Sequence, residues 1–504
     1  MSAAYLLSAQ RRLDRRAYLA LLGGGLLAVL GVLALGYQIG FTTELGALVG
    51  LVAVVAVIIR PSLSLYMMLA AVVFIEQEQL VIPVGTDNLP IFHWPPRMAG
   101  FIERPIGLFL VLALAAMLLQ RFARREQLLR GGALAWPLAA LMACVGWGII
   151  RGATSGGDIK IIVLEVRPYW YLALAYLLAT NLITSVRQVH TMVWIIIAGA
   201  ALKSLQGTYI VFGVLGGHIG AYHEIMAHEE SFFFVALMLL IVVFVLYFRD
   251  KKQLIAMACI LPFLLVALVG NQRRADYVAF LIGLLVAWVL IIYVKRRARG
   301  LLLTALISLV LLGGVYVVAF GNSGGALAQP ARAVITVFKP DATEAASNQY
   351  RVIEDYDLKY TARKNPLGYG FGKPFYQPAV LPNIQSLDQY YLYVPHNTIY
   401  WVLMRLGIIG DLAFWYLIGM IIVRITHVVK RLRTPYLKAI AIYAVGVVFM
   451  EITLAFADYQ LFFLRNVLFF GLIVGMALRF PALEEGKEAL HAAAHRKSNT
   501  THPW

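Results

Sequence analysis

The chain has 504 residues, of which 61% are hydrophobic and only 14% charged, and its mean hydropathy is +0.77. These values exclude a soluble globular protein and indicate a polytopic membrane protein, whose length is used for bilayer-spanning helices of about 20 residues each. The formal net charge of +17 does not indicate a nucleic-acid-binding protein, because the basic residues gather in short connections between apolar runs.

The apolar runs predict an all-α protein with about fourteen transmembrane helices. The first run extends from Ala17 to about Leu35 and follows a basic stretch, as in a signal peptide, but it shows no clear cleavage site and is interpreted as a retained span. In chain order the predicted spans are 17–36, 43–59, 62–82, 105–121, 133–150, 165–185, 189–212, 231–248, 253–271, 274–294, 301–320, 396–424, 435–457 and 462–480.

The basic connections predict the orientation of the chain. With the N-terminus in the cytoplasm, all of them fall on the cytoplasmic side, together with the tail 481–504. The connections concerned carry Arg11, Arg12, Arg15 and Arg16; Arg121, Arg124, Arg125 and Arg130; Arg249, Lys251 and Lys252; Lys295, Arg296, Arg297 and Arg299; and Lys430, Arg431 and Arg433.

One connection on the outer side, residues 321–395, is far longer than the others and includes a helix-like piece around Ala345 to Lys364. Long structureless connections are uncommon, so this one predicts a small, partly helical lid. The expected organisation is helices 1 to 11 in residues 1–320, the extracytoplasmic loop or lid in 321–395, helices 12 to 14 in 396–480, and a cytoplasmic tail in 481–504.

A second outer stretch, residues 212–230, is rich in histidine and glutamate, but it does not predict a metal site. Its histidines are five residues apart and therefore do not form a pair on one helix face. A solvated polar loop is favoured over a metal site. The residues are His218, His223, Glu224, His228, Glu229 and Glu230. Cys144 and Cys259 lie in apolar runs and are interpreted as small hydrophobic side chains.

Arginines near the outer ends of two spans are candidate anion ligands. Arg273 and Arg274 are adjacent at the outer side, where burial of charge is costly, so they need either Asp276 as a salt-bridge partner or an anionic ligand such as phosphate. Arg167 could pair with Glu165, extend to the interface, or form a second cationic site for a diphosphate.

The stretch from Tyr391 to Gly410 carries the strongest candidate for a base. Pro395 predicts a helix start, with His396 and Asn397 on the first turn and two glycines on the same stripe further along, which would let a neighbouring backbone approach beneath the histidine. A helix N-terminus attracts anions and disfavours imidazolium, so His396 would stay neutral beside a phosphate and could act as a base. The alternative is a helix that merely starts at the membrane interface with a polar cap.

These residues resemble motifs of the O-antigen ligase and O-antigen polymerase family of bacterial envelope glycan transferases. His396-Asn397, nine residues and then Gly407-x-x-Gly410 resembles the family's histidine motif, and Asn365 to Gly370 resembles the glycine turn that ends its periplasmic loop. Arg274 with Val278, and Glu165-x-Arg167, are similar to its arginine elements. The resemblance covers roughly residues 165 to 480.

The resemblance implies a C-type glycosyltransferase fold in the bacterial inner membrane, with the active site facing the periplasm or cell exterior. It also implies a glycan donor linked to undecaprenyl diphosphate, without a cofactor or metal. His396 would be the catalytic base, and Arg274, Arg273, Arg167 and Asn397 would bind substrate, with the choice between the adjacent arginines left open.

The sequence is compatible with two different acceptors for the glycan, and also with a protein of another class. Ligation of the glycan to lipid A core is the first expectation, and polymerisation of lipid-linked repeat units of O-antigen or exopolysaccharide is the second. A transporter of lipid-linked glycans is the alternative of another class, and it would need ionisable groups near the bilayer midplane. The candidates for such groups are Glu76, Glu78 and Glu451.

Overall fold

The computed structural model describes residues 41–76, 105–218, 224–248, 250–323, 328–338, 342–384 and 389–500, and all regular structure within these ranges is helical. The α-helices are α2 (Phe41–Ile59), α3 (Leu63–Phe74), α4 (Pro105–Ala123), α5 (Ala135–Thr154), α6 (Ile159–Leu182), α7 (Val186–Tyr209), α8 (His228–Leu246), α9 (Lys251–Gly270), α10 (Arg274–Val294), α11 (Arg299–Phe320), α12 (Gln329–Phe338), α13 (Ala342–Lys364), α14 (Thr398–Arg431), α15 (Pro435–Ala455) and α16 (Leu464–Thr500). Short helical turns are η1 (Gly132–Leu134), η2 (Ile210–Val214), η4 (Arg296–Ala298) and η6 (Gln460–Phe462).

Within the described part of the chain, 11 helices are long and apolar enough to cross a membrane. They are α4 to α11 and α14 to α16, and each coincides with a predicted span, which confirms an all-helical polytopic membrane protein. The predicted span 17–36 lies outside the described residues. The span expected at 43–59 forms α2, whereas the one expected at 62–82 is shorter than predicted, because α3 ends at Phe74 and Ile75 is extended.

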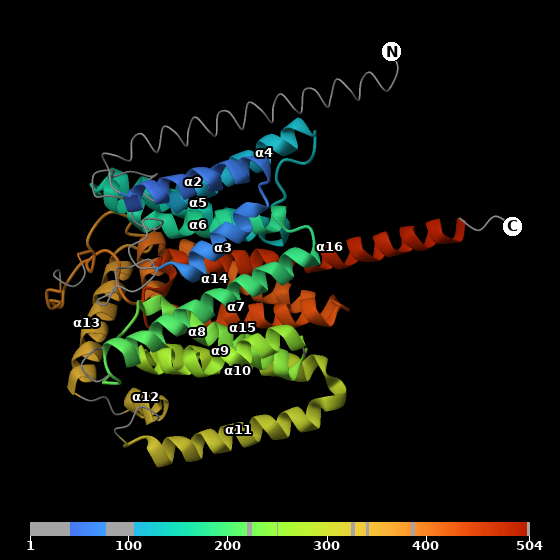
Figure 1. The fold of residues 1–504 in the computed structure, drawn as a ribbon. Coiled ribbons are helices and arrows are strands. Elements are labelled where there is room, and N and C mark those ends of the chain that lie inside the picture. Colours follow the sequence, from blue (N-terminus) through green and yellow to red (C-terminus); the bar gives the residue numbers. More distant parts are fainter. Residues whose placement is uncertain are drawn as a thin grey trace.

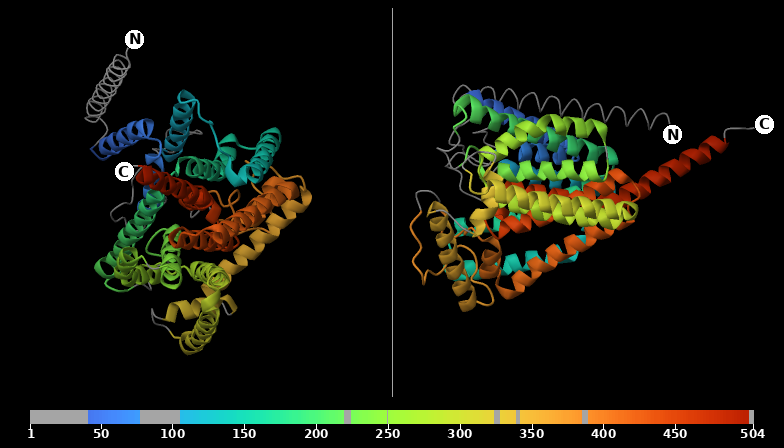
Figure 2. Two further views of the ribbon diagram at one scale, coloured as in Figure 1. Left: turned by 90° about the vertical axis from the view of Figure 1, so that its right-hand side faces the viewer. Right: turned by 90° about the horizontal axis from the view of Figure 1, so that it is seen from below.

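The long helices lie side by side in one bundle (Figure 1). The most extensive contacts join α6 to α16, α7 to α9, α10 to α15, and α5 to α14, so segments far apart in the sequence pack together. Most of the apolar segments of α8, α15 and α16 is buried inside the protein, whereas Leu302 is the only buried residue of α11. Figure 2 shows α11 at the edge of the bundle, where its apolar surface faces the surroundings.

Helix α13 lies across one end of the bundle, with α12 beside it (Figure 1). Its presence confirms the helix expected around residues 345–364 of the long connection. Helices α10 and α14 both begin at this end, and each is followed at the opposite end by basic residues, Lys295 to Arg297 and Lys430 to Arg433. The bundle therefore has one end covered by α13 and one end rich in basic connections.

Candidate active site

The candidate base lies at the start of α14, directly beneath α13. Helix α14 begins at Thr398, and the side-chain oxygen of Asn397 accepts a hydrogen bond from the Tyr400 N–H at 3.1 Å, so Asn397 is the N-cap. The prediction that His396 and Asn397 lie on the first turn is therefore wrong. Asparagine is among the preferred N-cap residues, and the residue after Pro395 stays outside the helix. His396 is thus held beside the helix N-terminus.

The expected stripe from His396 to the two glycines does not form, because α14 is interrupted at Gly407. This residue has φ 71° and ψ −174°, which is a conformation open almost only to glycine. The glycine turn of the long loop fills the interruption: the Ile408 N–H donates to the Pro366 oxygen at 3.0 Å, and the Tyr369 N–H donates to the Met404 oxygen at 2.8 Å. The close backbone approach predicted for Gly407 is confirmed, and the neighbour is the chain's own turn.

His396 is held by a carboxylate from α13. Its backbone N–H donates to Glu354 Oε2 at 2.9 Å, and its Nδ1 lies 3.2 Å from Glu354 Oε1. The edges of the Tyr350 and Tyr459 rings flank the imidazole, with ring centroids 5.7 Å away in each case. The Glu354 side chain is buried, whereas the His396 side chain is 26% exposed. Contact through Nδ1 leaves Nε2 for an incoming hydroxyl.

Asp458, in the connection after α15, brings one predicted arginine close to His396. The guanidinium of Arg273 forms an ion pair with the Asp458 carboxylate, and Thr398 Oγ1 donates to the Asp458 backbone oxygen at 3.1 Å. Burial raises the pKa of Asp458, but the nearby Arg273, His228 and His396 lower it more, so the pKa lies below its ordinary value. Residues from three distant parts of the chain therefore surround one buried carboxylate.

Arg273 and Arg274 differ in position. Arg273 is the N-cap residue of α10, and although burial lowers its pKa, Asp458 and Asp276 raise the pKa above its ordinary value. Arg274 is the first residue of the helix and is half-buried. The predicted partner Asp276 lies near Arg273, but the ion pair is made with Asp458. Sequence reasoning missed Asp458, for which the only signal was an aspartate in a short connection between two spans.

Glu165 was predicted as a possible partner of Arg167, but its carboxylate pairs with another arginine. Glu165 Oε1 pairs with Arg405 Nη2 at 2.5 Å, and both side chains are fully buried. The Gly372 N–H donates to Glu165 Oε2 at 2.6 Å, so the pair also holds the loop. Arg405 was missed, although an arginine inside an apolar span always needs a partner. Arg167 lies half-buried in the third turn of α6, and its role as a second diphosphate ligand stays a prediction.

Residues 212–230 were expected to form a solvated loop, but their last part, at the start of α8, is buried. Glu229 and Glu230 are fully buried and pair with Arg465, and His228 Nδ1 lies 2.7 Å from Glu224 Oε2. The reason is that Arg465 on α16 supplies a buried charge that the local sequence does not show. His223 lies outside the described residues. Within the described ranges no group of three or more potential metal ligands is found.

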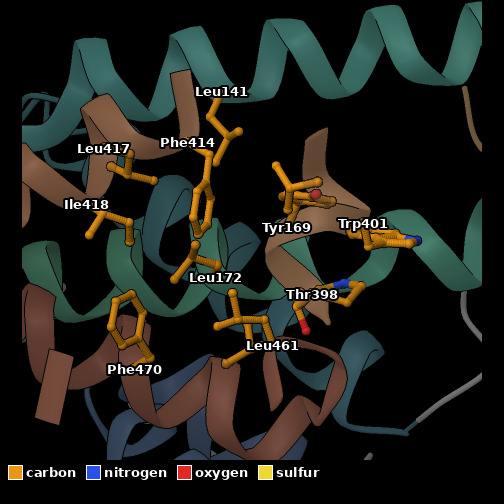
Figure 3. A pocket seen from close by; sticks show the side chains of 13 residues that line it. Leu141, Tyr169, Leu172, Thr398, Trp401, Phe414, Leu417, Ile418, Leu461 and Phe470 are labelled. Carbon is orange, nitrogen blue, oxygen red and sulfur yellow. The ribbon is translucent and has the colours of Figure 1, made fainter. Parts of the chain in front are cut away.

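An apolar pocket of about 40 Å³ lies beneath Thr398, between α5, α6, α14 and α16. Figure 3 shows Tyr169, Trp401 and Leu461 around it, with Phe414 and Phe470 further along. The pocket is too small and too apolar for a sugar, so the polar groups above it form the candidate active site.

Comparison with protein families gives a match for part of the chain. Residues 257–416 match the sequence profile of a family described as O-antigen ligase. The matched stretch runs from α9 into α14 and includes Arg273, Glu354 and His396. No curated protein sequence matches the chain.

Proposed function

Because the chain carries an O-antigen ligase family domain over residues 257–416, we propose that it transfers a glycan from undecaprenyl diphosphate to a hydroxyl group of an acceptor sugar. Membership of this family implies glycan transfer of the ligase or polymerase type by a multi-pass membrane protein. Ligation to lipid A core is the first proposal for the acceptor, and growth of a lipid-linked repeat-unit chain is the second.

The observation that supports this proposal most strongly is the placement of the His396 imidazole and the Arg273 guanidinium around Asp458. The two groups are far apart in the sequence, yet Arg273 pairs with the Asp458 carboxylate and the His396 ring lies 5.7 Å from that of the next residue, Tyr459. Guanidinium groups bind phosphate through paired hydrogen bonds, and a helix N-terminus adds positive potential. The N-termini of α10 and α14 both lie at this end, so the site supplies positive charge for a diphosphate and a base for a hydroxyl.

In the proposed reaction, the acceptor oxygen attacks the anomeric carbon of the donor sugar while its proton passes to Nε2 of His396. The bond between that carbon and the diphosphate oxygen breaks, and the electron pair leaves on undecaprenyl diphosphate. Arg273, with Arg274 and Arg167, would stabilise the charge that develops on the leaving group. One displacement inverts the anomeric centre. Glu354 would hold the proton on Nδ1, and Asn397 would fix the position of His396 by capping α14.

Basic residues gather at the end of the bundle opposite to His396, which favours a cytoplasmic position for that end. The active site would then face the periplasm or the cell exterior. Glu76, a candidate ion-coupling residue of a transporter, forms a buried ion pair with Lys203, so a structural role accounts for it. Glu451 is fully buried in α15, and Glu78 lies outside the described residues.

The test is glycan transfer by purified protein in EDTA, with an undecaprenyl-diphosphate-linked glycan as donor and lipid A core as acceptor. His396→Ala should lower turnover about 10²- to 10⁴-fold, the usual contribution of a positioned base. Arg273→Gln and Arg274→Gln should each lower transfer, whereas Arg363→Gln, an exposed change on α13, should not.

Near-normal turnover in the His396 variant and in both arginine variants, with folding unaltered, would refute the mechanism. Product that lengthens on the lipid carrier, without modification of lipid A core, would select polymerisation. Counterflow of a labelled lipid-linked glycan without bond cleavage would select transport instead.

A further inference from the structure

A polar hollow lies at the end of the bundle opposite to the candidate active site. Its volume is about 280 Å³, and its walls come from the end of α2, the end of α4 and the end of α6. Helix α6 has 24 residues, so at about 1.5 Å per residue the hollow lies roughly 35 Å from the start of that helix. It is therefore separate from the site proposed to bind the donor diphosphate.

The hollow is strongly basic. Arg60, Arg121 and Arg124 line it, and Glu126 is the only acidic residue among its lining residues. Arg130 lies close enough to Arg121 and Arg479 to repel both electrostatically. Positive charge therefore exceeds negative charge in and around this space.

The guanidinium of Arg121, which lines the hollow, is held in place by hydrogen bonds. Its Nη1 donates to Asn181 Oδ1 at 2.5 Å, and its Nη2 donates to the Asn181 backbone oxygen at 2.8 Å. In the part of the chain that the structure describes, the guanidinium groups of Arg60 and Arg124 make no hydrogen bond or ion pair, and both side chains are exposed. Two exposed guanidinium groups thus line the hollow together with one that hydrogen bonds hold in place.

The surface beside the hollow is apolar. Leu119 and Phe122 on α4 are 68% and 72% exposed, and Ile59 at the end of α2 is 59% exposed. These side chains lie within a few residues of the basic groups and at the ends of membrane-spanning helices. Basic pockets at such positions suit ligands with an anionic head and apolar chains.

We infer that this hollow binds the phosphate head group of an anionic phospholipid. Guanidinium groups recognise phosphate in a bidentate manner, and a hollow of about 280 Å³ has room for a phosphoglycerol group. The acyl chains would lie along the exposed apolar side chains of α2 and α4. A free phosphate ion would use the arginines but not this apolar surface. The inference is independent of the proposed glycan transfer.

The test is lipid retention by the purified full-length protein. Native mass spectrometry after exposure to equal amounts of phosphatidylglycerol and phosphatidylcholine should show preferential retention of phosphatidylglycerol. In Arg60→Gln/Arg124→Gln the affinity for phosphatidylglycerol should fall about 30-fold, since each basic residue near an anionic lipid contributes about 1 kcal/mol and 1.4 kcal/mol is a factor of ten.

The matched control is Arg296→Gln/Arg297→Gln, which removes the same charge from the same end of the bundle through exposed side chains outside the hollow. Retention in the control should equal that of the wild type. Equal losses in the two variants would overturn the inference in favour of general surface charge, and no preference in the wild type would also overturn it. Displacement of the lipid by millimolar inorganic phosphate would identify free phosphate as the ligand. If the double variant unfolds, Arg124→Gln alone is compared with Arg297→Gln.

Discussion

At the residue scale, the histidine of the motif depends on a partner that lies 42 positions earlier in the chain. The carboxylate of Glu354 contacts both the backbone N–H and the ring Nδ1 of His396. A carboxylate in this position holds the ring in one orientation and one tautomer, and it stabilises the imidazolium that forms when the base takes a proton. Glu354 is therefore a positioning residue for the proposed base.

Glu354→Gln should lower kcat about ten- to a hundredfold, part of the 10²–10⁴ that a positioned base contributes, while KM changes little. Loss of the carboxylate frees the ring to turn away from the position in which Nε2 can accept the proton. The measurement is kcat and KM for glycan transfer by the folded variant.

The matched control is Asp357→Asn, which removes another buried carboxylate from α13. Asp357 accepts a hydrogen bond from the Ala379 N–H at 3.1 Å and does not contact His396. This variant should keep the wild-type kcat. An unchanged kcat in Glu354→Gln would show that Glu354 supports the loop and not the base.

At the element scale, α14 consists of two helical segments that meet at Gly407. Its interruption at Gly407 exposes backbone groups that the glycine turn of the long loop satisfies, and Gly368 and Gly370 in that turn also have positive φ. The turn packs on α5 as well, because the Trp147 Nε1–H donates to the Leu367 oxygen at 3.0 Å. The long loop, which carries Glu354 on α13, is thereby joined at two levels to α14, beside whose N-terminus His396 lies.

Gly407→Ala should destabilise the protein by several kcal/mol. A side chain in this backbone conformation costs about 1–3 kcal/mol, and the added Cβ would lie 2.5 Å from the Pro366 oxygen, which adds an overpacking cost of about 1–3 kcal/mol. The measurement is thermal unfolding in detergent.

Gly419→Ala, in the same helix, is the control. A Cβ at Gly419 would meet nothing within 4 Å, so this variant should be neutral or stabilised by up to about 1 kcal/mol. Equal melting temperatures for the two variants would show that the interruption at Gly407 has no structural importance.

At the scale of the whole molecule, buried ion pairs join helices that are distant in the sequence. Lys203 on α7 pairs with Glu76 just after α3, and Arg465 on α16 pairs with Glu229 and Glu230 on α8. All these side chains are fully buried. A buried charge without its partner is far more costly than the intact pair, so these contacts select one packing of the helices.

Lys203→Met should destabilise the protein by about 3–5 kcal/mol, because it leaves the Glu76 carboxylate buried without its cation. The double variant Lys203→Met/Glu76→Leu should recover most of this loss. Unfolding of the wild type, both single variants and the double variant gives the coupling energy. A double variant no more stable than Lys203→Met would contradict the pairing.

The sequence by itself determined the class of protein, eleven of its membrane-spanning helices, the helix in the long loop, and His396 as the candidate base. These features depend on hydrophobic period, run length and local turn chemistry, which act over a few residues. Only the tertiary structure decided which charges meet: Glu354 with His396, Asp458 with Arg273, and Arg405 with Glu165. These pairs are 42 to 240 positions apart, and helix packing brings them together, so no local pattern reports them. The interruption of α14 at Gly407 could not be predicted from the sequence for the same reason. A glycine in an apolar run is compatible with a continuous helix, and here the helix is interrupted because a distant turn of the chain forms hydrogen bonds with its backbone.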